Sequence, residues 1–451
     1  MAFDPKPWVE VDGDRIRCDG AAVGFAPVVL DGFEITWGRD DYMAHSRPGT
    51  VAFSIVDRTR TWADRISART VLGRRVTIGW SADGVADQVC FRGRVTAATA
   101  RPTDRPGQWV IAFTAAGRDA DLGNILAAPE TWPRETMIVR ANRIADMAAP
   151  AEIDEFYFFP GSVNIQCWPL DVGGRDLRRL TEEFYYSMGD TFSYIPDQNV
   201  CRHLFRRAYA VGVYFTHIAG DAIYLFPSST QYDGVTYHGI ALPGAQTTTD
   251  DPALSAGPNS VVTRCEVTWK DNTAGFNDWT TVVEIPSGDA NGRRTLTFDS
   301  WIDDGVHIDP MIAAVLARAE HEGASPRHPP VTLDTRYTGG GFLSVAQARA
   351  LTLAGETQAA AYVSGSQFAA WTPAHHPVFA IIGGTIGHVD GRWRITCRLS
   401  TIWRTNAVTP MRWNQLVSWM WWQRPDDFKL ARSITWNDFR YFDDPTVYNP
   451  A

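Results

Sequence analysis

The chain has 451 residues, of which 45% are hydrophobic and 21% charged, and it carries a formal net charge of −9 at pH 7. This composition indicates a folded protein of roughly two to four domains and excludes a disordered chain. The acidic balance argues against specific nucleic-acid binding as the main function, because such a surface needs concentrated positive charge.

Targeting and membrane-spanning signals are not evident in the sequence. The first residues have neither the basic start nor the apolar stretch of a signal peptide. No apolar run approaches the ~20 residues that span a bilayer. The six cysteines form no CxxC pair, and in a reducing cytoplasm we expect no disulfide framework. We therefore expect a chain that is made in the cytoplasm and has no membrane span.

Residues 1–125 show the alternating pattern of strands. Apolar residues recur at every second position in 33–37, 51–57, 76–80, 89–95 and 109–115. Short strands at this spacing, each with one apolar face, predict a small barrel or sandwich. Gly93 lies in mid-strand and indicates a bulge or a bend.

Residues 126–245 change to an α+β pattern. Helical spacing predicts helices over 135–147 and 174–188, with Gly189 at the end of the second one. Strands at 191–195 and 200–205 then predict a hairpin. The stretch from Pro243 to Pro258 is rich in Thr, Asp and Pro and indicates a boundary loop.

Strand patterns return over 261–300 and again over 378–400, where Asp390-Gly391 is a strong hairpin turn. Between them, Asp309 and Pro310 are typical of a helix start, and a second helix is predicted over 344–353. We therefore predict a second barrel that is split between 246–302 and 360–400, with a helical α+β insertion over 303–359. The predicted fold class is mixed and mainly β.

The last segment, 401–451, is rich in tryptophan and is expected to be an extended arm. A short arm cannot bury so many indoles within itself, so they must pack on the body or on another chain. We favour a subunit contact, since interfaces are enriched in Trp and Arg. The candidate interface residues are Trp403, Trp413, Trp419, Trp421, Trp422 and Trp436.

Candidate catalytic and metal residues are few. His321-Glu322 begins a zinc-protease pattern, but Ser325 stands where the second histidine is needed. Asp303, Asp304, His307 and Asp309 form a crowded cluster that could hold a hard cation, or could be a solvated loop before a helix. We favour the loop. The chain has no Gly-x-Ser-x-Gly elbow, and we predict no catalytic, cofactor or metal site.

The order of these segments resembles the minor tail proteins of actinobacteriophages, which form the baseplate hub or tail tip and are related to the spike hub of type VI secretion. The matching segments are 33–41 (FEITWGRDD), 52–57 (AFSIVD), 91–95 (FRGRV), 120–124 (ADLGN), 386–389 (IGHV) and 393–400 (WRITCRLS).

The resemblance implies two β-barrel hub domains with α+β insertions and no enzyme activity. It also implies a homotrimer, in which six similar barrels connect a sixfold tail tube to a threefold tip. Implied partners are the distal tail or tail tube protein, the tape measure protein and other minor tail proteins. The implied location is the tail tip of a siphophage-like virion, after synthesis in the host cytoplasm, and the implied role includes host cell entry.

Two alternatives remain. The tryptophans of the arm could stack on sugar rings, which would make the chain a carbohydrate-binding tail module that recognises a receptor or the cell wall. A cell-wall hydrolase is the second alternative, and it would need a catalytic group such as Asp303 or His307.

Overall fold

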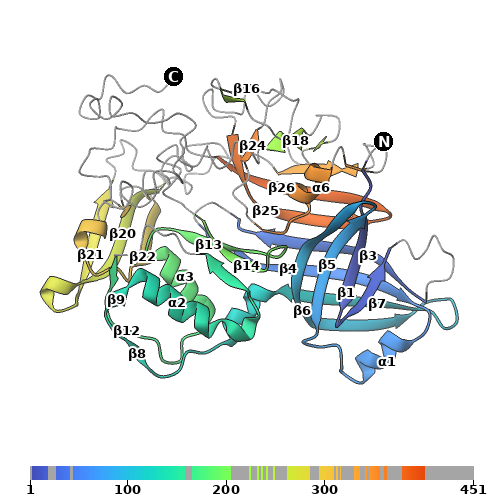
Figure 1. Ribbon diagram of the computed structural model, residues 1–451, viewed down its shortest axis with the longest axis horizontal. Helices are drawn as coiled ribbons and strands as arrows, with labels where there is room; N and C mark the ends of the chain where they lie inside the picture. Colours follow the sequence, from blue (N-terminus) through green and yellow to red (C-terminus); the bar gives the residue numbers. More distant parts are fainter. Residues whose placement is uncertain are drawn as a thin grey trace.

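The computed structural model describes residues 3–18, 27–40, 44–157, 165–204, 262–284, 294–308 and 378–401, with shorter pieces between 223 and 248 and between 311 and 362. The described part is dominated by strands, which confirms the mainly β class (Figure 1). Its largest element is a continuous 14-stranded sheet.

The first seven strands form one half of this sheet, called here the N-terminal half-sheet. Its order is β3-β4-β7-β6-β5-β1-β2, and each neighbouring pair is antiparallel. The half-sheet curls, so that β2 returns close to β3. Its strands are β1 (Lys6–Val11), β2 (Asp14–Arg17), β3 (Val28–Gly38), β4 (Arg47–Asp57), β5 (Arg75–Ala82), β6 (Val85–Pro102) and β7 (Trp109–Gly117), and helix α1 (Thr61–Ser67) follows β4.

Alternation explains why these residues form a curled sheet. Along most of β3, β4 and β7 every second side chain is buried, and Phe53 and Phe113 stack across the strand pair with ring centroids 4.7 Å apart. Trp62 of α1 meets Phe113 edge to face at 5.7 Å. The alternation predicted from the sequence is therefore the inward face of one curled sheet.

The other seven strands form the C-terminal half-sheet. Strand β25 is its long member; β26 pairs with one edge of β25, and β23 and β19 follow β26. The strands are β15 (Ile223–Tyr224), β18 (Ile240–Ala241), β19 (Thr247–Thr248), β23 (Val331–Asp334), β24 (Ala360–Tyr362), β25 (Val378–Val389) and β26 (Arg392–Thr401).

Strand β25 joins the two half-sheets. Its first residues pair with β24, and residues 383–388 pair with β3. Glycines make this junction possible, because a Cβ atom on Gly38 of β3 would lie 2.2 Å from the Ile382 carbonyl oxygen, and one on Gly383 of β25 would lie 2.7 Å from the Trp37 carbonyl oxygen. Backbones this close leave no space for a side chain.

A third group of elements, the helical body, lies beside the N-terminal half-sheet (Figure 1). Strands β10, β14 and β13 form one of its sheets, and β21, β20 and β22 form another. The main elements are α2 (Met137–Met147), α3 (Leu177–Tyr186), β10 (Glu155–Tyr157), β13 (Thr191–Ile195), β14 (Val200–Leu204), β20 (Val262–Asp271), β21 (Asn277–Glu284) and β22 (Arg294–Asp299).

The remaining elements are short. Strands β8 (Thr131–Trp132) and β12 (Leu170–Asp171) pair, as do β9 (Glu135–Thr136) with β11 (Gln166–Cys167), and β16 (Gln231–Tyr232) with β17 (Val235–Thr236). Helix α6 spans Val345–Leu351, and 3-10 turns occur at η2 (Arg118–Asn124), η3 (Ala149–Ala151) and η8 (Asn272–Ala274).

The described residues form two hydrophobic cores. One is shared by the N-terminal half-sheet and strands β23, β25 and β26. The other joins α2, α3, β13 and β20, and includes Trp301. The sequence pattern predicts one barrel that is split between 246–302 and 360–400. In the described part of the structure, β20, β21 and β22 pair only with one another and pack with α2 and α3, because their apolar face completes the core of the helical body.

Candidate assembly surfaces

The helical body and the N-terminal half-sheet meet at a charged seam. Glu152, which follows η3, contacts Arg75 of β5 through its carboxylate. Arg94 of β6 lies 3.4 Å from the same carboxylate, and Arg118 lies 3.5 Å from it. The pKa of Glu152 is lowered, mainly by the hydrogen bond that Arg75 donates to its carboxylate. Three arginines from the half-sheet side thus hold one carboxylate of the body.

A second seam contact is buried. Asp119 of η2 is only 3% exposed, and its Oδ2 lies 3.2 Å from Nη1 of Arg178 of α3. Arg178 also donates to the Ser46 carbonyl. Burial raises the pKa of Asp119, and the charge of Arg178 partly offsets this rise. The ion pair fixes α3 against the half-sheet.

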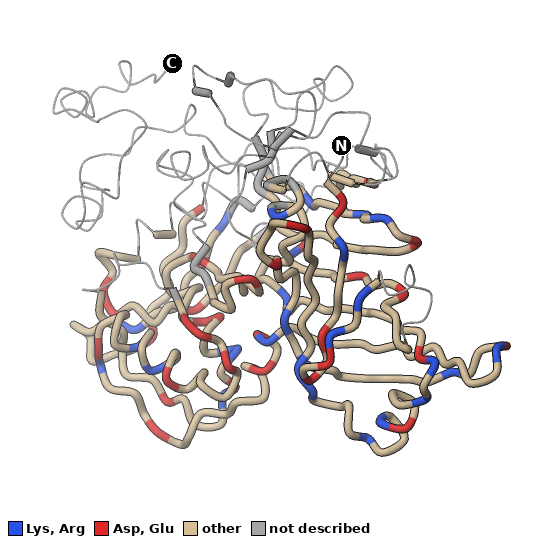
Figure 2. Tube along the Cα trace, turned by 45° about the vertical axis from the view of Figure 1, so that its right-hand side comes forward, with Lys and Arg blue, Asp and Glu red and all other residues tan. Residues whose placement is uncertain are grey.

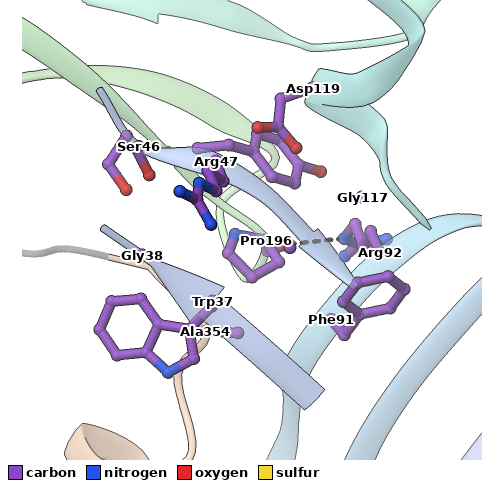
Figure 3. A pocket seen from close by; sticks show the side chains of 13 residues that line it. Trp37, Gly38, Ser46, Arg47, Phe91, Arg92, Gly117, Asp119, Pro196 and Ala354 are labelled. Carbon is purple, nitrogen blue, oxygen red and sulfur yellow. Dashed lines mark hydrogen bonds between the residues drawn. The ribbon is translucent and has the colours of Figure 1, made fainter. Parts of the chain in front are cut away.

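A small pocket lies at this seam (Figure 3). Trp37 and Phe91 come from the half-sheet, and Pro196 comes from the helical body. The Arg92 guanidinium donates to the Pro196 carbonyl at 2.7 Å, so it spans the seam. Within the described part of the chain, Asp119 Oδ1 has no hydrogen-bond partner. The polar groups of the pocket mainly hold the two bodies together.

Among the described residues of 303–309, the acidic side chains do not point toward one common position where a cation could bind. Asp303 is fully buried and accepts hydrogen bonds from Arg134 and from the Asn272 side chain, the latter at 3.2 Å. Asp304 instead accepts from the Val306 backbone N–H at 2.9 Å, as a turn residue does. Asp309 lies outside the described residues. No group of three or more His, Cys, Asp or Glu side chains in the described part could hold a metal ion.

No disulfide joins any of the six cysteines, as expected. Burial raises the pKa of Cys90, Cys167, Cys265 and Cys397 to about 12. Cys201 is also buried, and burial raises its pKa well above the ordinary value. A thiol with such a pKa is protonated near neutral pH and is a poor nucleophile or metal ligand. These buried cysteines act as small apolar core residues.

The six tryptophans predicted at a subunit interface lie outside the described residues, so that assignment stays a prediction. Exposed apolar side chains do occur on β21, where Trp279 is 51% exposed and Val282 is 43% exposed.

Positive and negative residues are interspersed along the described chain instead of forming separate blocks (Figure 2). Among the described helices, none has the length and apolar character needed to cross a membrane.

Comparison with known proteins relates this architecture to a group of solved structures. No family model and no curated protein matches the chain. The structure of the tail protein from Neisseria meningitidis MC58 matches with a TM-score of 0.50 and 12% sequence identity, covering 89% of this chain and 99% of that one. The chain has the fold of a tail protein.

Two further solved structures resemble this tail-protein fold. The 43 kDa tail protein of prophage MuSo2 from Shewanella oneidensis has a TM-score of 0.47 and 10% identity, over 89% of this chain and 98% of that one. A type VI secretion component of E. coli, described as similar to the T4 tail proteins gp27 and gp5, has a TM-score of 0.42 and 12% identity, with 87% of this chain and 76% of that one covered. The match to the tail protein from Neisseria meningitidis MC58 confirms the predicted resemblance to tail proteins as a likeness of fold, and the assignment to actinobacteriophages stays a prediction.

Sequence patterns missed the seam residues of this tail-protein fold. In the structure, Arg178 and Glu182 of the predicted helix 174–188 contact at 2.9 Å as an i,i+4 pair. Arg178 is mostly buried because it also binds Asp119. Asp119 lies 59 positions away from Arg178 along the chain, so the pairing leaves no local sequence signal.

Proposed function

We propose that the chain is a structural component of a phage tail, located at the baseplate hub or tail tip. The observation that carries this proposal is the likeness of fold to a solved tail protein, a match that covers 89% of the chain. A continuous sheet that joins two half-sheets also suits an adaptor, because it holds two β surfaces in a fixed relation.

We further propose that the protein acts as a homotrimer. Three chains with two half-sheets each would supply six β units, the number that matches a sixfold tail tube at one side, while the three chains match a threefold tip at the other. The distal tail or tail tube protein and the tape measure protein are the expected neighbours. We propose that the protein acts by assembly, which is supported by the ion pairs in which the carboxylates of Asp119, Glu152 and Asp303 take part.

The experiment combines mass photometry of the purified chain with antibody-gold labelling of intact virions. We expect a concentration-dependent trimer and gold particles confined to one end of the tail. A chain that stays monomeric up to concentrations well above those in an infected cell and is missing from virions would overturn the proposal. Host cell-wall zymograms of the same preparation test the hydrolase alternative, and a lytic band that survives further purification would favour it.

A further inference from the structure

Strand β21 lies at the edge of its sheet. The order of that sheet is β21-β20-β22, so in the described part of the chain only β20 pairs with β21. Its eight residues extend from Asn277 to Glu284. In an antiparallel pair, alternate backbone N–H and C=O groups of an edge strand point away from its partner and remain available to another strand.

The side chains of β21 do not protect this edge. Proteins usually block an exposed edge with short strands and charges, and β2 follows that rule with Asp14, Arg15 and Arg17 in a strand of four residues. In β21 the charged residues are confined to the ends, Asp278 and Glu284, and the centre reads Trp-Thr-Thr-Val-Val. An edge of this length and composition is typical of a strand-addition site.

The two exposed apolar side chains of β21 point to opposite faces of the sheet. Trp279 is opposite Trp269 in the register, whereas Val282 is opposite Glu266, which belongs to the other face. A partner that packed on one face would leave the other apolar side chain in water. A strand paired along the edge would contact both faces at once, so the geometry favours strand addition over face packing.

We propose that β21 receives the tryptophan-rich segment 413–422 from the C-terminal arm of a second copy of this chain. Fifty residues follow Thr401, which is ample length to reach a neighbouring subunit. Segment 413–422 (WNQLVSWMWW) has no charged residue and is flanked by Arg412 and Arg424. Asp278 and Glu284 at the ends of β21 lie 3.6 Å from Lys270 and Arg264 of β20, respectively, and are largely exposed. Arg412 and Arg424 would add a second cation at each acidic end, while the indoles cover Trp279 and Val282.

This inference rests on the proposed homotrimer and names one of its contacts. Its test uses two full-length chains with different tags. One carries Thr280→Cys on β21, and the other carries Ser418→Cys in the arm. After mixing, a short flexible bis-maleimide joins the two thiols if they lie close together. The matched control replaces Thr280→Cys by Leu72→Cys, since Leu72 is as exposed as Trp279, at 51% each.

We expect a cross-linked product with both tags from the Thr280→Cys mixture and only background from the Leu72→Cys mixture. Trimer formation without a specific cross-link would overturn the inference and leave the proposed function standing. A chain that never forms trimers would overturn both. A cross-link confined within single chains of the double variant, Thr280→Cys with Ser418→Cys, would refute the exchange between copies.

A second measurement does not depend on the cross-linker. The double variant Trp279→Ser/Val282→Thr removes both exposed apolar side chains of β21. It should raise the protein concentration at which half of the chains are assembled roughly 10-fold or more, because a buried Trp commonly dominates an interface. Leu72→Ser should leave that concentration unchanged. Equal assembly of the two variants, each with a native circular dichroism spectrum, would contradict the inference.

Discussion

The junction between β3 and β25 makes the Gly38→Ala variant the most informative stability test. Gly38 has φ +84°, and a Cβ atom there would lie 2.2 Å from the Ile382 oxygen and 2.3 Å from Gly383 Cα. The left-handed conformation alone costs an L-residue about 1–2 kcal/mol. Overpacking against a backbone that cannot withdraw adds about 1–3 kcal/mol. The expected loss in the free energy of unfolding is therefore about 2–5 kcal/mol.

Gly73→Ala is the matched control. Gly73 also has a positive φ, +73°, but a Cβ atom added there would have no neighbouring atom within 4 Å. This variant should lose only the conformational share, about 1–2 kcal/mol. Urea denaturation of both variants, followed by tryptophan fluorescence and by hydrogen exchange in β3 and β25, measures the difference. Equal losses, or unchanged exchange in β25, would refute the reasoning that close backbone packing joins the half-sheets.

Three further predictions concern buried and charged groups. First, Arg140→Met should lower the free energy of unfolding by about 3–5 kcal/mol. Arg140 is fully buried, its guanidinium lies over the rings of Trp132 and Trp301, and it pairs with Glu135 at 2.8 Å. Urea denaturation measures this loss, and the double variant Glu135→Gln/Arg140→Met, which removes both charges, should lose less. Second, a thiol reagent at pH 8 should label at most Cys18 rapidly in the native protein and all six cysteines in urea; rapid native labelling of Cys90, whose pKa is raised to about 12, would contradict the burial. Third, the pKa of Glu152 is lowered, so its carboxylate stabilises the fold at pH values above its ordinary pKa of 4.5, and this contribution is lost as the pH falls through the lowered pKa. Glu152→Gln should therefore lower the midpoint of urea denaturation at neutral pH but not in strong acid. A difference between the midpoints of the variant and the original chain that persists in strong acid would count against the ion pair.

Local patterns predicted the elements well. Alternation identified the strands around Phe53 and Phe113, because each has one buried face and the period of a strand is two. Helical spacing placed the helices at 135–147 and 174–188, and the structure has them at Met137–Met147 and Leu177–Tyr186. Asp390-Gly391 forms the predicted turn, with both residues at positive φ. These signals arise within a few residues of one another.

Pairing between distant strands could not be read in the same way. The pattern of β25 is compatible with many neighbours, and nothing within residues 383–388 indicates that they pair with 33–38. For the same reason, the strands at 262–299 have the alternation of a barrel although they complete the core of the helical body. The seam contacts also join residues that are far apart along the chain, since Arg178, which pairs with the buried Asp119, lies 59 positions after it.

The shared strand β25 also has a mechanical consequence. Two domains joined by a loop can rotate independently, but the half-sheets are joined by one covalent strand that is hydrogen-bonded in both. A twisting load on one half-sheet therefore passes directly along the backbone of β25 into the other. The register of β25 against β26 shifts between Ile381 and Gly383, on that path, and a bulge disrupts the ladder and increases the local twist of the strand. Torsion should concentrate at this bulge and leave the curvature of each half-sheet intact.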